Sequence, residues 1–132
     1  MQSLTSKETR VMKCLWDSEE KITSSEITRR ANERYGSDWK LTTVSTFLTH
    51  LVNKGFLKLE RNGKVYTYEI LISEEEYLQY EMGRMADFWA GGTSGKLIAA
   101  LKRGKKVSSE DLKGLREMID ELDGENYNNR SV

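Results

Sequence analysis

Residues 24–70 limit what this chain can fold into more than any other stretch, because two amphipathic helical segments are followed there by a hairpin pattern. At 3.6 residues per turn, the segment 42–54 has two distinct sides. Apolar side chains occupy one side, namely Val44, Phe47, Leu48, Leu51 and Val52. Short hydrogen-bonding side chains occupy the other, namely Thr42, Ser45, Thr46, Thr49 and Asn53. We expect this segment to pack one face on a core and to present hydroxyl groups on the other.

The hairpin is predicted from Asn62-Gly63, which lies between alternating runs at 56–61 and 64–70. Asn-Gly is the preferred pair in a two-residue type I′ turn. Such a turn gives the hairpin an apolar face that can lie on the helices. The pairs that it predicts on this face are Leu59 with Tyr66 and Leu57 with Tyr68.

Two helix starts carry the capping-box pattern of a hydroxyl followed three residues later by a carboxylate, Thr5 with Glu8 and Thr23 with Glu26. The first helix is expected to end near Trp16. The second is expected to cover 24–35, after which Gly36 suits a left-handed C-cap. Ile22 is a candidate for a short third strand. The expected core side chains of these helices are Leu4, Val11, Cys14, Leu15, Ile27, Ala31 and Tyr35.

Helices followed by a hairpin in this order are the outline of a winged helix-turn-helix, so the expected fold class is mainly α (α+β). We expect residues 1–72 to form this domain. The helix 42–54 would enter a DNA major groove, where hydroxyls reach base edges and threonine methyl groups meet thymine methyls. Arg61 and Lys64 would flank the wing tip and lie on the phosphate backbone, although charged residues at a hairpin tip can also be merely solvated.

Residues 73–123 are expected to form a second, helical domain, followed by a polar tail over 124–132. Ser73 suits an N-cap and Gly91-Gly92 breaks the first helix, after which we expect helices over 94–101 and from 108. A second copy of the chain covers such short amphipathic helices more economically than a helical cap on the same monomer. The predicted dimerisation residues are Leu78, Met82, Met85, Trp89, Leu97, Leu101, Leu112, Leu115, Ile119 and Leu122.

The formal net charge is zero but unevenly divided. Residues 1–72 hold 12 Lys or Arg against 9 Asp or Glu, and residues 73–132 hold 9 against 12. The resulting +3 and −3 place the nucleic-acid surface in the N-terminal part. No run has the length of a membrane span and no signal-peptide pattern is present, so we expect the protein in the cytoplasm. With one cysteine, Cys14, and one histidine, His50, we expect no disulfide, metal, cofactor or small-molecule ligand.

Several motifs follow one order along almost the whole chain. They are Leu4-Thr5-x-x-Glu8, the segments 11–16 and 43–51, Lys54-Gly55-Phe56-Leu57, Tyr66-Thr67-Tyr68, Gly91-Gly92 and the segment 112–119. In these motifs the chain resembles the penicillinase-repressor family, the BlaI/MecI/CopY group. The resemblance implies a homodimeric repressor with an N-terminal winged-helix DNA-binding domain and a C-terminal helical dimerisation domain. In the antibiotic-responsive members, it implies that a membrane sensor protease leads to repressor cleavage and release of DNA.

The same resemblance places base or phosphate contacts at Thr42, Thr43, Ser45, Thr46 and His50. Near Thr42, Ser45 and His50 the antibiotic-responsive members have basic residues, so this face cannot read guanine through Arg and we expect a different operator. The cleaved Asn–Phe bond of those members aligns with Ala100-Leu101 after a one-residue gap, which makes this bond the candidate proteolysis site. The C-terminal Cys-x-Cys motifs of the copper-responsive members are absent from 124–132, which excludes copper sensing by that route.

The leading hypothesis is a homodimeric DNA-binding transcriptional repressor that binds a palindromic operator through the helix 42–54 and the wing 61–64, with release by an upstream sensor or protease signal. Its predicted DNA-binding residues are Thr42, Thr43, Ser45, Thr46, Thr49, His50, Asn53, Arg61 and Lys64. The alternative is a winged-helix module for protein interaction without sequence-specific DNA binding. An enzyme is not expected, because one His, one Cys and no glycine-rich phosphate loop leave no nucleophile with a base.

Overall fold

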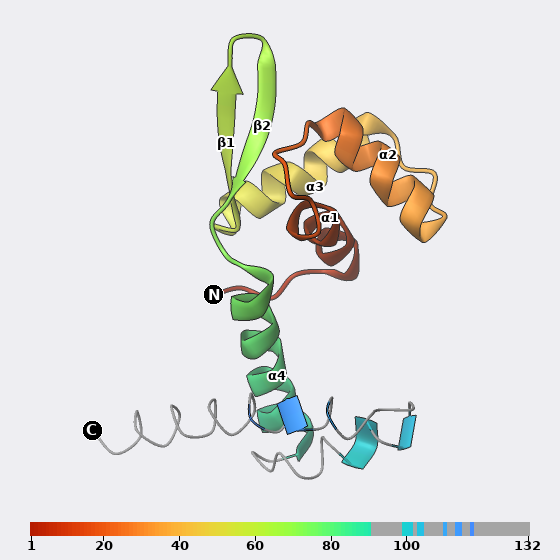
Figure 1. Ribbon diagram of the computed structural model, residues 1–132, viewed down its shortest axis with the longest axis vertical. Coiled ribbons are helices and arrows are strands. Elements are labelled where there is room, and N and C mark those ends of the chain that lie inside the picture. The colour runs from red at the N-terminus through yellow and green to blue at the C-terminus, as the bar shows by residue number, and fades with distance from the viewer. Residues whose placement is uncertain (91–98, 102, 105–109, 111–112, 115–116, 118–132) are drawn as a thin grey trace, which may run out of the picture. The chain divides into compact units, whose positions relative to one another are not determined.

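The computed structural model describes residues 1–90, 99–101, 103–104, 110, 113–114 and 117, with residues 89 and 90 described through their backbone alone. Its elements are α1 (Ser6–Trp16), α2 (Ser24–Tyr35), α3 (Leu41–Asn53), β1 (Leu57–Asn62), β2 (Val65–Ile70) and α4 (Glu74–Ala90) (Figure 1). The chain divides into two compact units, Met1–Glu74 and Glu75–Val132.

The start of α1 forms the predicted capping box. The Glu8 N–H donates to Thr5 Oγ1 (3.1 Å), and the Thr5 N–H donates to Glu8 Oε1 (2.9 Å). A cap of this kind stabilises a helix start by about 1 kcal/mol, because it satisfies N–H groups that have no partner within the helix. The inner face of α1 buries Val11, Met12, Cys14 and Leu15, whereas Leu4 is half-buried and not part of the core.

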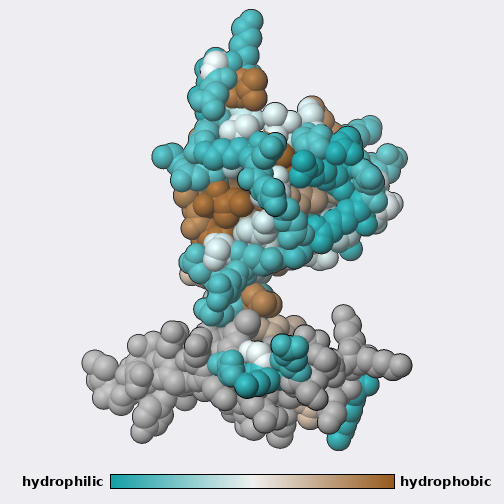
Figure 2. All heavy atoms as spheres, in the orientation of Figure 1, coloured by the Kyte–Doolittle hydropathy of each residue, from teal (hydrophilic) through white to brown (hydrophobic). Residues whose placement is uncertain are grey.

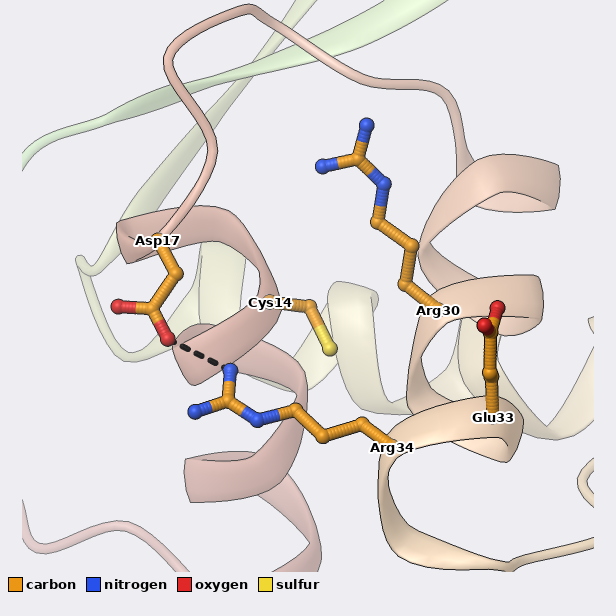
Figure 3. A pocket seen from close by; sticks show the side chains of 5 residues that line it. All are labelled: Cys14, Asp17, Arg30, Glu33 and Arg34. Carbon is orange, nitrogen blue, oxygen red and sulfur yellow. Dashed lines mark hydrogen bonds and ion pairs between the residues drawn. The ribbon is translucent and has the colours of Figure 1, made fainter.

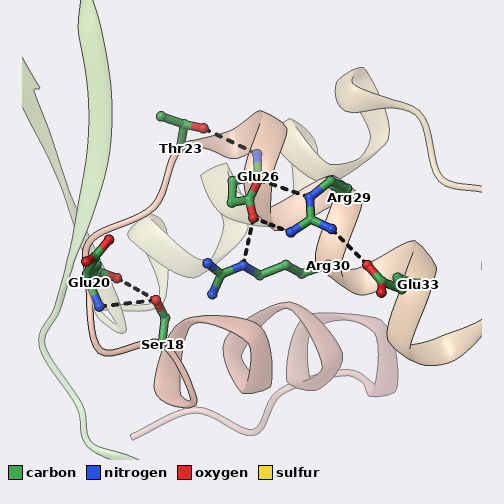
Figure 4. Close-up of polar contacts among 7 residues, drawn as sticks. All are labelled: Ser18, Glu20, Thr23, Glu26, Arg29, Arg30 and Glu33. Carbon is green, nitrogen blue, oxygen red and sulfur yellow. Dashed lines mark hydrogen bonds and ion pairs between the residues drawn. The ribbon is translucent and has the colours of Figure 1, made fainter.

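The range of α2 agrees with the prediction, and Gly36 ends the helix with a φ of 64°, the left-handed conformation that favours glycine. Only half of the predicted second capping box forms. The Glu26 N–H donates to Thr23 Oγ1 (3.2 Å), but the Glu26 carboxylate accepts from Arg29 and Arg30 instead (Figure 4). The hydrogen bonds from Arg29 and then Arg30 lower the pKa of Glu26 to about 2. Charge-assisted bonds to guanidinium groups are stronger than a bond to a neutral N–H, which explains the choice.

The core of the first unit lies where α1, α2 and α3 pack against one another, and the β1–β2 hairpin projects away from these helices (Figure 1). Burial of each large apolar side chain contributes about 1.5–3 kcal/mol. The largest fully buried side chains are Val11, Met12, Ile27, Val44, Leu48, Leu51, Phe56 and Leu57. Ile22 is also buried, but the predicted third strand is wrong, because the segment 21–23 has no strand conformation in the described chain. A lone apolar residue contributes its side chain to a core without pairing its backbone.

The hairpin turns one residue later than predicted, so the predicted pairing is wrong. The observed pairs are Asn62 with Val65, Leu59 with Tyr68 and Leu57 with Ile70, which leaves Gly63-Lys64 as the two-residue turn. Gly63 has a φ of 65°, and no non-glycine residue of the described chain has a positive φ. Glycine at the first central position and a negative φ at the second fit a type II′ turn, whereas a type I′ turn would need a positive φ at Asn62.

The apolar face of the hairpin packs on the helices at its base and not, as predicted, along its length. Leu57 is buried, whereas Leu59 is 47% exposed and Tyr66 and Ile70 are also exposed. Figure 2 shows apolar atoms open to solvent on the hairpin. The reason is geometric, since β1 leaves the helices after Leu57 and carries its later residues into solvent (Figure 1).

In the second unit, α4 begins after Ser73 as predicted and buries Tyr77 and Ala86. Four of the predicted dimerisation residues have described side chains. Leu78 and Met85 are exposed, Met82 is half-buried, and Leu101 is half-buried in a helical segment after the exposed Ala100. The others lie outside the described side chains: Trp89, Leu97, Leu112, Leu115, Ile119 and Leu122. The glycine break at 91–92 and the tail 124–132 lie outside the described residues as well.

Candidate nucleic-acid interface

The two sides of α3 separate as the sequence predicts. Val44, Leu48 and Leu51 are fully buried, while Phe47 and Val52 are half-buried. The opposite side carries the predicted contact residues, of which Thr42, Thr46, Thr49, His50 and Asn53 are exposed and Thr43 and Ser45 half-buried. The helix contains no Lys, Arg, Asp or Glu. Its solvent face is therefore a row of short polar side chains that includes one imidazole, that of His50.

Two threonines of this face use their hydroxyl hydrogens within the helix. Thr46 Oγ1 donates to the Thr42 carbonyl (3.1 Å), and Thr49 Oγ1 donates to the Ser45 carbonyl (3.0 Å). Bonds of this kind to the preceding turn are common for threonine in helices. In this conformation both side chains present an acceptor oxygen and a methyl group to solvent. Such a surface suits the amino groups of adenine and cytosine and the methyl group of thymine.

The amino terminus of α3 is left open, unlike those of α1 and α2. Lys40 occupies the N-cap position and makes no side-chain cap, and the first turn contains no acidic residue. The first N–H groups of a helix carry partial positive charge and attract anions. This end of α3 can therefore accept a phosphate next to the polar face.

The turn between α2 and α3 is held by Asn32, a residue that the sequence analysis missed. Asn32 Nδ2 donates to the Trp39 carbonyl (2.9 Å), and Asn32 Oδ1 accepts the Trp39 N–H (2.9 Å) and the Ser37 hydroxyl (2.9 Å). The Trp39 ring also packs edge-on against Phe47, with 5.2 Å between ring centroids. One amide thus holds both backbone groups of the residue that precedes the N-cap of α3.

A buried carboxylate lies behind the other end of α3. Glu8 is 2% exposed, and its Oε1 accepts from Lys54 Nζ (2.6 Å) as well as from the Thr5 N–H. Its Oε2 lies 3.6 Å from His50 Nδ1. Burial alone would raise the pKa of Glu8, but the hydrogen bonds from Lys54 and Thr5 outweigh it and lower the pKa. Glu8 is therefore an ionised carboxylate beside His50, the one histidine of α3. From the sequence, Glu8 was expected only to cap α1.

The tip of the hairpin carries the two predicted cations. Arg61 Nε donates to the Gly63 carbonyl (2.8 Å), and its guanidinium lies 5.5 Å from the centroid of the Tyr66 ring. These contacts orient Arg61 at the turn. Lys64 is exposed within the turn itself. The tip therefore presents two positive charges on an ordered turn.

A surface hollow of about 410 Å³ lies between α1 and α2, away from the predicted site residues (Figure 3). Its walls carry charges of both signs, and Arg34 Nη1 donates to Asp17 Oδ2 (2.6 Å) across it. The Cys14 sulfur points between Arg30 and Arg34, but burial raises the pKa of this thiol more than the two arginines lower it. The thiol therefore stays protonated, as expected for a small buried core residue.

No helix in the described part of the chain is both long and apolar enough to cross a membrane. Within the same residues, no three His, Cys, Asp or Glu side chains come together as a metal site would require.

Three packed helices with a two-stranded hairpin directly after the third define a winged helix-turn-helix protein. A family model described as penicillinase repressor matches residues 4–121. The chain belongs to the penicillinase repressor family, whose members are DNA-binding transcriptional repressors and not enzymes. The expected fold class, the expected family and the expected lack of an enzymatic function are thereby confirmed.

Two relatives of this chain are distant in sequence, but the matches cover most of each relative's length. The penicillinase repressor of Bacillus licheniformis is 25% identical over 114 residues, which cover 86% of this chain and 87% of the relative. The methicillin resistance regulatory protein MecI of Mammaliicoccus sciuri is 22% identical over 118 residues, which cover 88% and 92%. A solution structure of monomeric Bacillus licheniformis BlaI in complex with the blaP half-operator is 29% identical over 58% of this chain and 89% of that chain, with a TM-score of 0.48.

Proposed function

We propose that this protein is a homodimeric repressor that binds a palindromic operator, with one α3 helix in the major groove of each half-site. The observation that carries the proposal is the solvent face of α3, a row of uncharged hydrogen-bonding side chains in a chain of a repressor family.

Base recognition is assigned to the polar side of α3. Thr46 and Thr49 would offer acceptor oxygens and methyl groups to base edges, and Asn53 can both donate and accept. Thr42, Thr43, Ser45 and His50 complete the contact set. Because no arginine lies on this face, adenine, thymine and cytosine edges are better matched than guanine.

Phosphate recognition is assigned to two parts of the protein, one for each DNA backbone beside the major groove. The open amino terminus of α3 would hold one backbone, and Arg61 and Lys64 at the hairpin tip would hold the other. Each phosphate that the protein neutralises releases counterions from the DNA. The affinity therefore falls as the salt concentration rises, and it falls more steeply when more phosphates are contacted. Residues 1–72, with a net charge of +3, would form the DNA-binding domain.

Dimerisation is assigned to residues 73–123. Leu78 and Met85 on α4 are exposed, and Phe88 beside them is 76% exposed. Large apolar side chains gathered on one helix usually mark an interface, and two-fold symmetry would match a palindromic site. A repressor of this kind would act in the cytoplasm, and an upstream sensor or protease would release it by a cut at Ala100-Leu101, of which Ala100 is exposed.

The test is a footprint of the purified full chain on fragments of the neighbouring genome, followed by titration of the protected duplex at several salt concentrations. We expect two protected half-sites about one helical turn, or a small multiple of it, apart. The double variant Arg61→Ala, Lys64→Ala removes two phosphate contacts from each half-site. The slope of log affinity against log salt should therefore become less steep by about two units per half-site. The matched control is Arg103→Ala, Lys113→Ala, which removes the same charge from exposed positions of the second unit.

Three results would each contradict a part of the proposal. Equal affinity for the protected fragment and for random duplex would show that the chain is not a sequence-specific repressor. An unchanged salt slope in the Arg61, Lys64 variant would remove the hairpin tip from the interface. A monomer at the concentrations that protect both half-sites would contradict the dimer alone.

A further inference from the structure

One oxygen of the buried Glu8 carboxylate is fully engaged and the other faces the DNA-binding helix. Oε1 accepts from Lys54 and from the Thr5 N–H, which leaves Oε2 as the oxygen 3.6 Å from His50 Nδ1. The His50 side chain is 54% exposed. The imidazole therefore has one nitrogen beside a buried negative charge while much of its ring faces solvent.

His50 lies within the proposed contact row, one turn after Thr46 and one turn before Asn53. The helix holds no other charged or titratable side chain, so protonation of His50 changes the charge of the α3 face from zero to +1. Glu8, on α1, is the carboxylate that lies within ion-pair distance of the His50 ring among the described residues. Lys54, which donates to the other oxygen of that carboxylate, also donates to the Ser3 carbonyl (3.1 Å), so its ammonium group is engaged within the protein.

We propose that His50 is a proton-dependent DNA contact and that Glu8 is its positioning residue. The imidazolium forms an ion pair with Glu8 through Nδ1, 3.6 Å from Oε2, and donates Nε2–H to a phosphate oxygen of the operator. In the neutral ring, the negative charge beside Nδ1 favours a hydrogen on that nitrogen, so Nε2 carries a lone pair and cannot donate. Operator binding therefore strengthens as the pH falls. The inference rests on the proposed DNA-binding function and adds a pH response to it.

The experiment measures the affinity of the full chain for the footprinted duplex at about pH 8 and about pH 5.5, the range in which imidazole changes charge. We expect about tenfold tighter binding per half-site at the lower pH, since a hydrogen bond to a charged group contributes at least this factor. The slope of log affinity against log salt should also increase by about 0.9 per half-site. His50 is the one histidine of the chain, so His50→Gln should remove both changes. His50→Arg should restore tight binding at both pH values.

The role of Glu8 is tested by a double-mutant cycle with His50→Gln. Glu8→Gln should weaken binding severalfold at the lower pH when His50 is present and have no further effect in the His50→Gln background. A carboxylate that merely supports the fold would weaken binding in both backgrounds and at both pH values. Circular dichroism shows whether Glu8→Gln stays folded, and Glu8→Asp replaces it in the cycle if it does not.

The outcomes separate this inference from the proposed function. Sequence-specific binding that is equally tight at both pH values overturns the proton-dependent contact and leaves the repressor standing. A pH response that survives in His50→Gln assigns it to another group and also overturns the inference. Absence of specific binding at every pH overturns the proposed function, and this inference with it.

Discussion

Replacement of Asn32 by alanine tests whether the turn before α3 is held in place by one side chain. The change removes three hydrogen bonds, two to the backbone of Trp39 and one from the Ser37 hydroxyl. Each such bond contributes about 0.5–1.5 kcal/mol, and the half-buried Trp39 groups regain part of this by hydration, so we expect a loss of about 2 kcal/mol. For a unit the size of Met1–Glu74, this lowers the melting temperature by roughly 10 °C.

The same substitution should weaken DNA binding beyond its effect on stability. With the amide gone, the turn at Trp39 must be ordered again when α3 docks, at a cost of about 1–2 kcal/mol, or roughly tenfold in affinity. The assays are thermal unfolding by circular dichroism and titration of the operator fragment well below the melting temperature. Ser25→Ala, on an exposed position of the same helix, is the control and should change neither. A melting temperature and an affinity both equal to those of the unmodified protein would refute the argument that Asn32 holds the turn.

Two further predictions concern the core and the buried carboxylate. Leu48→Ala should lower the free energy of unfolding by about 2–5 kcal/mol because it opens a cavity in the three-helix core, whereas Leu59→Ala on the exposed part of the hairpin should change it by less than about 1 kcal/mol in chemical denaturation. The lowered pKa of Glu8 means that its contribution to stability is present above the ordinary carboxyl value of 4.5 and is lost as the pH falls further. The free energy of unfolding should therefore fall less steeply from neutral to acidic pH in Glu8→Gln than in the unmodified protein. An equally steep fall in both proteins would contradict a stabilising role for the ionised Glu8 carboxylate.

Local signals in the sequence predict the elements of the first unit well. The bounds of α2 follow from a hydroxyl before its first turn and a glycine after its last, and both act within four residues of the helix end. The apolar spacing of α3 likewise predicts the burial of Val44, Leu48 and Leu51, because 3.6-residue periodicity states which side chains share a face.

Contacts between distant residues account for what the sequence did not predict. Glu8 and Lys54 are 46 positions apart, so the sequence displays a capping carboxylate and a helix-end lysine without their ion pair. Asn32 reads as an ordinary polar residue of α2, because its partner Trp39 lies beyond the helix end. The error at the hairpin has a local cause. Asn62-Gly63 allows two registers, and the sequence favours the turn with positive φ at both residues over the one observed.

The uncharged face of α3 changes how affinity would be divided in the proposed complex. In a recognition helix with arginines, the same side chains supply base readout and attraction to phosphate. Here readout falls to hydroxyl and amide groups, while Arg61, Lys64 and the open end of α3 supply the attraction at neutral pH. Readout by threonine tolerates little displacement, since a hydrogen bond weakens steeply once its geometry is lost. The contacts that hold the two ends of α3, Asn32 at its start and the Glu8–Lys54 pair at its end, therefore matter more for specificity here than they would beside a long, adaptable arginine.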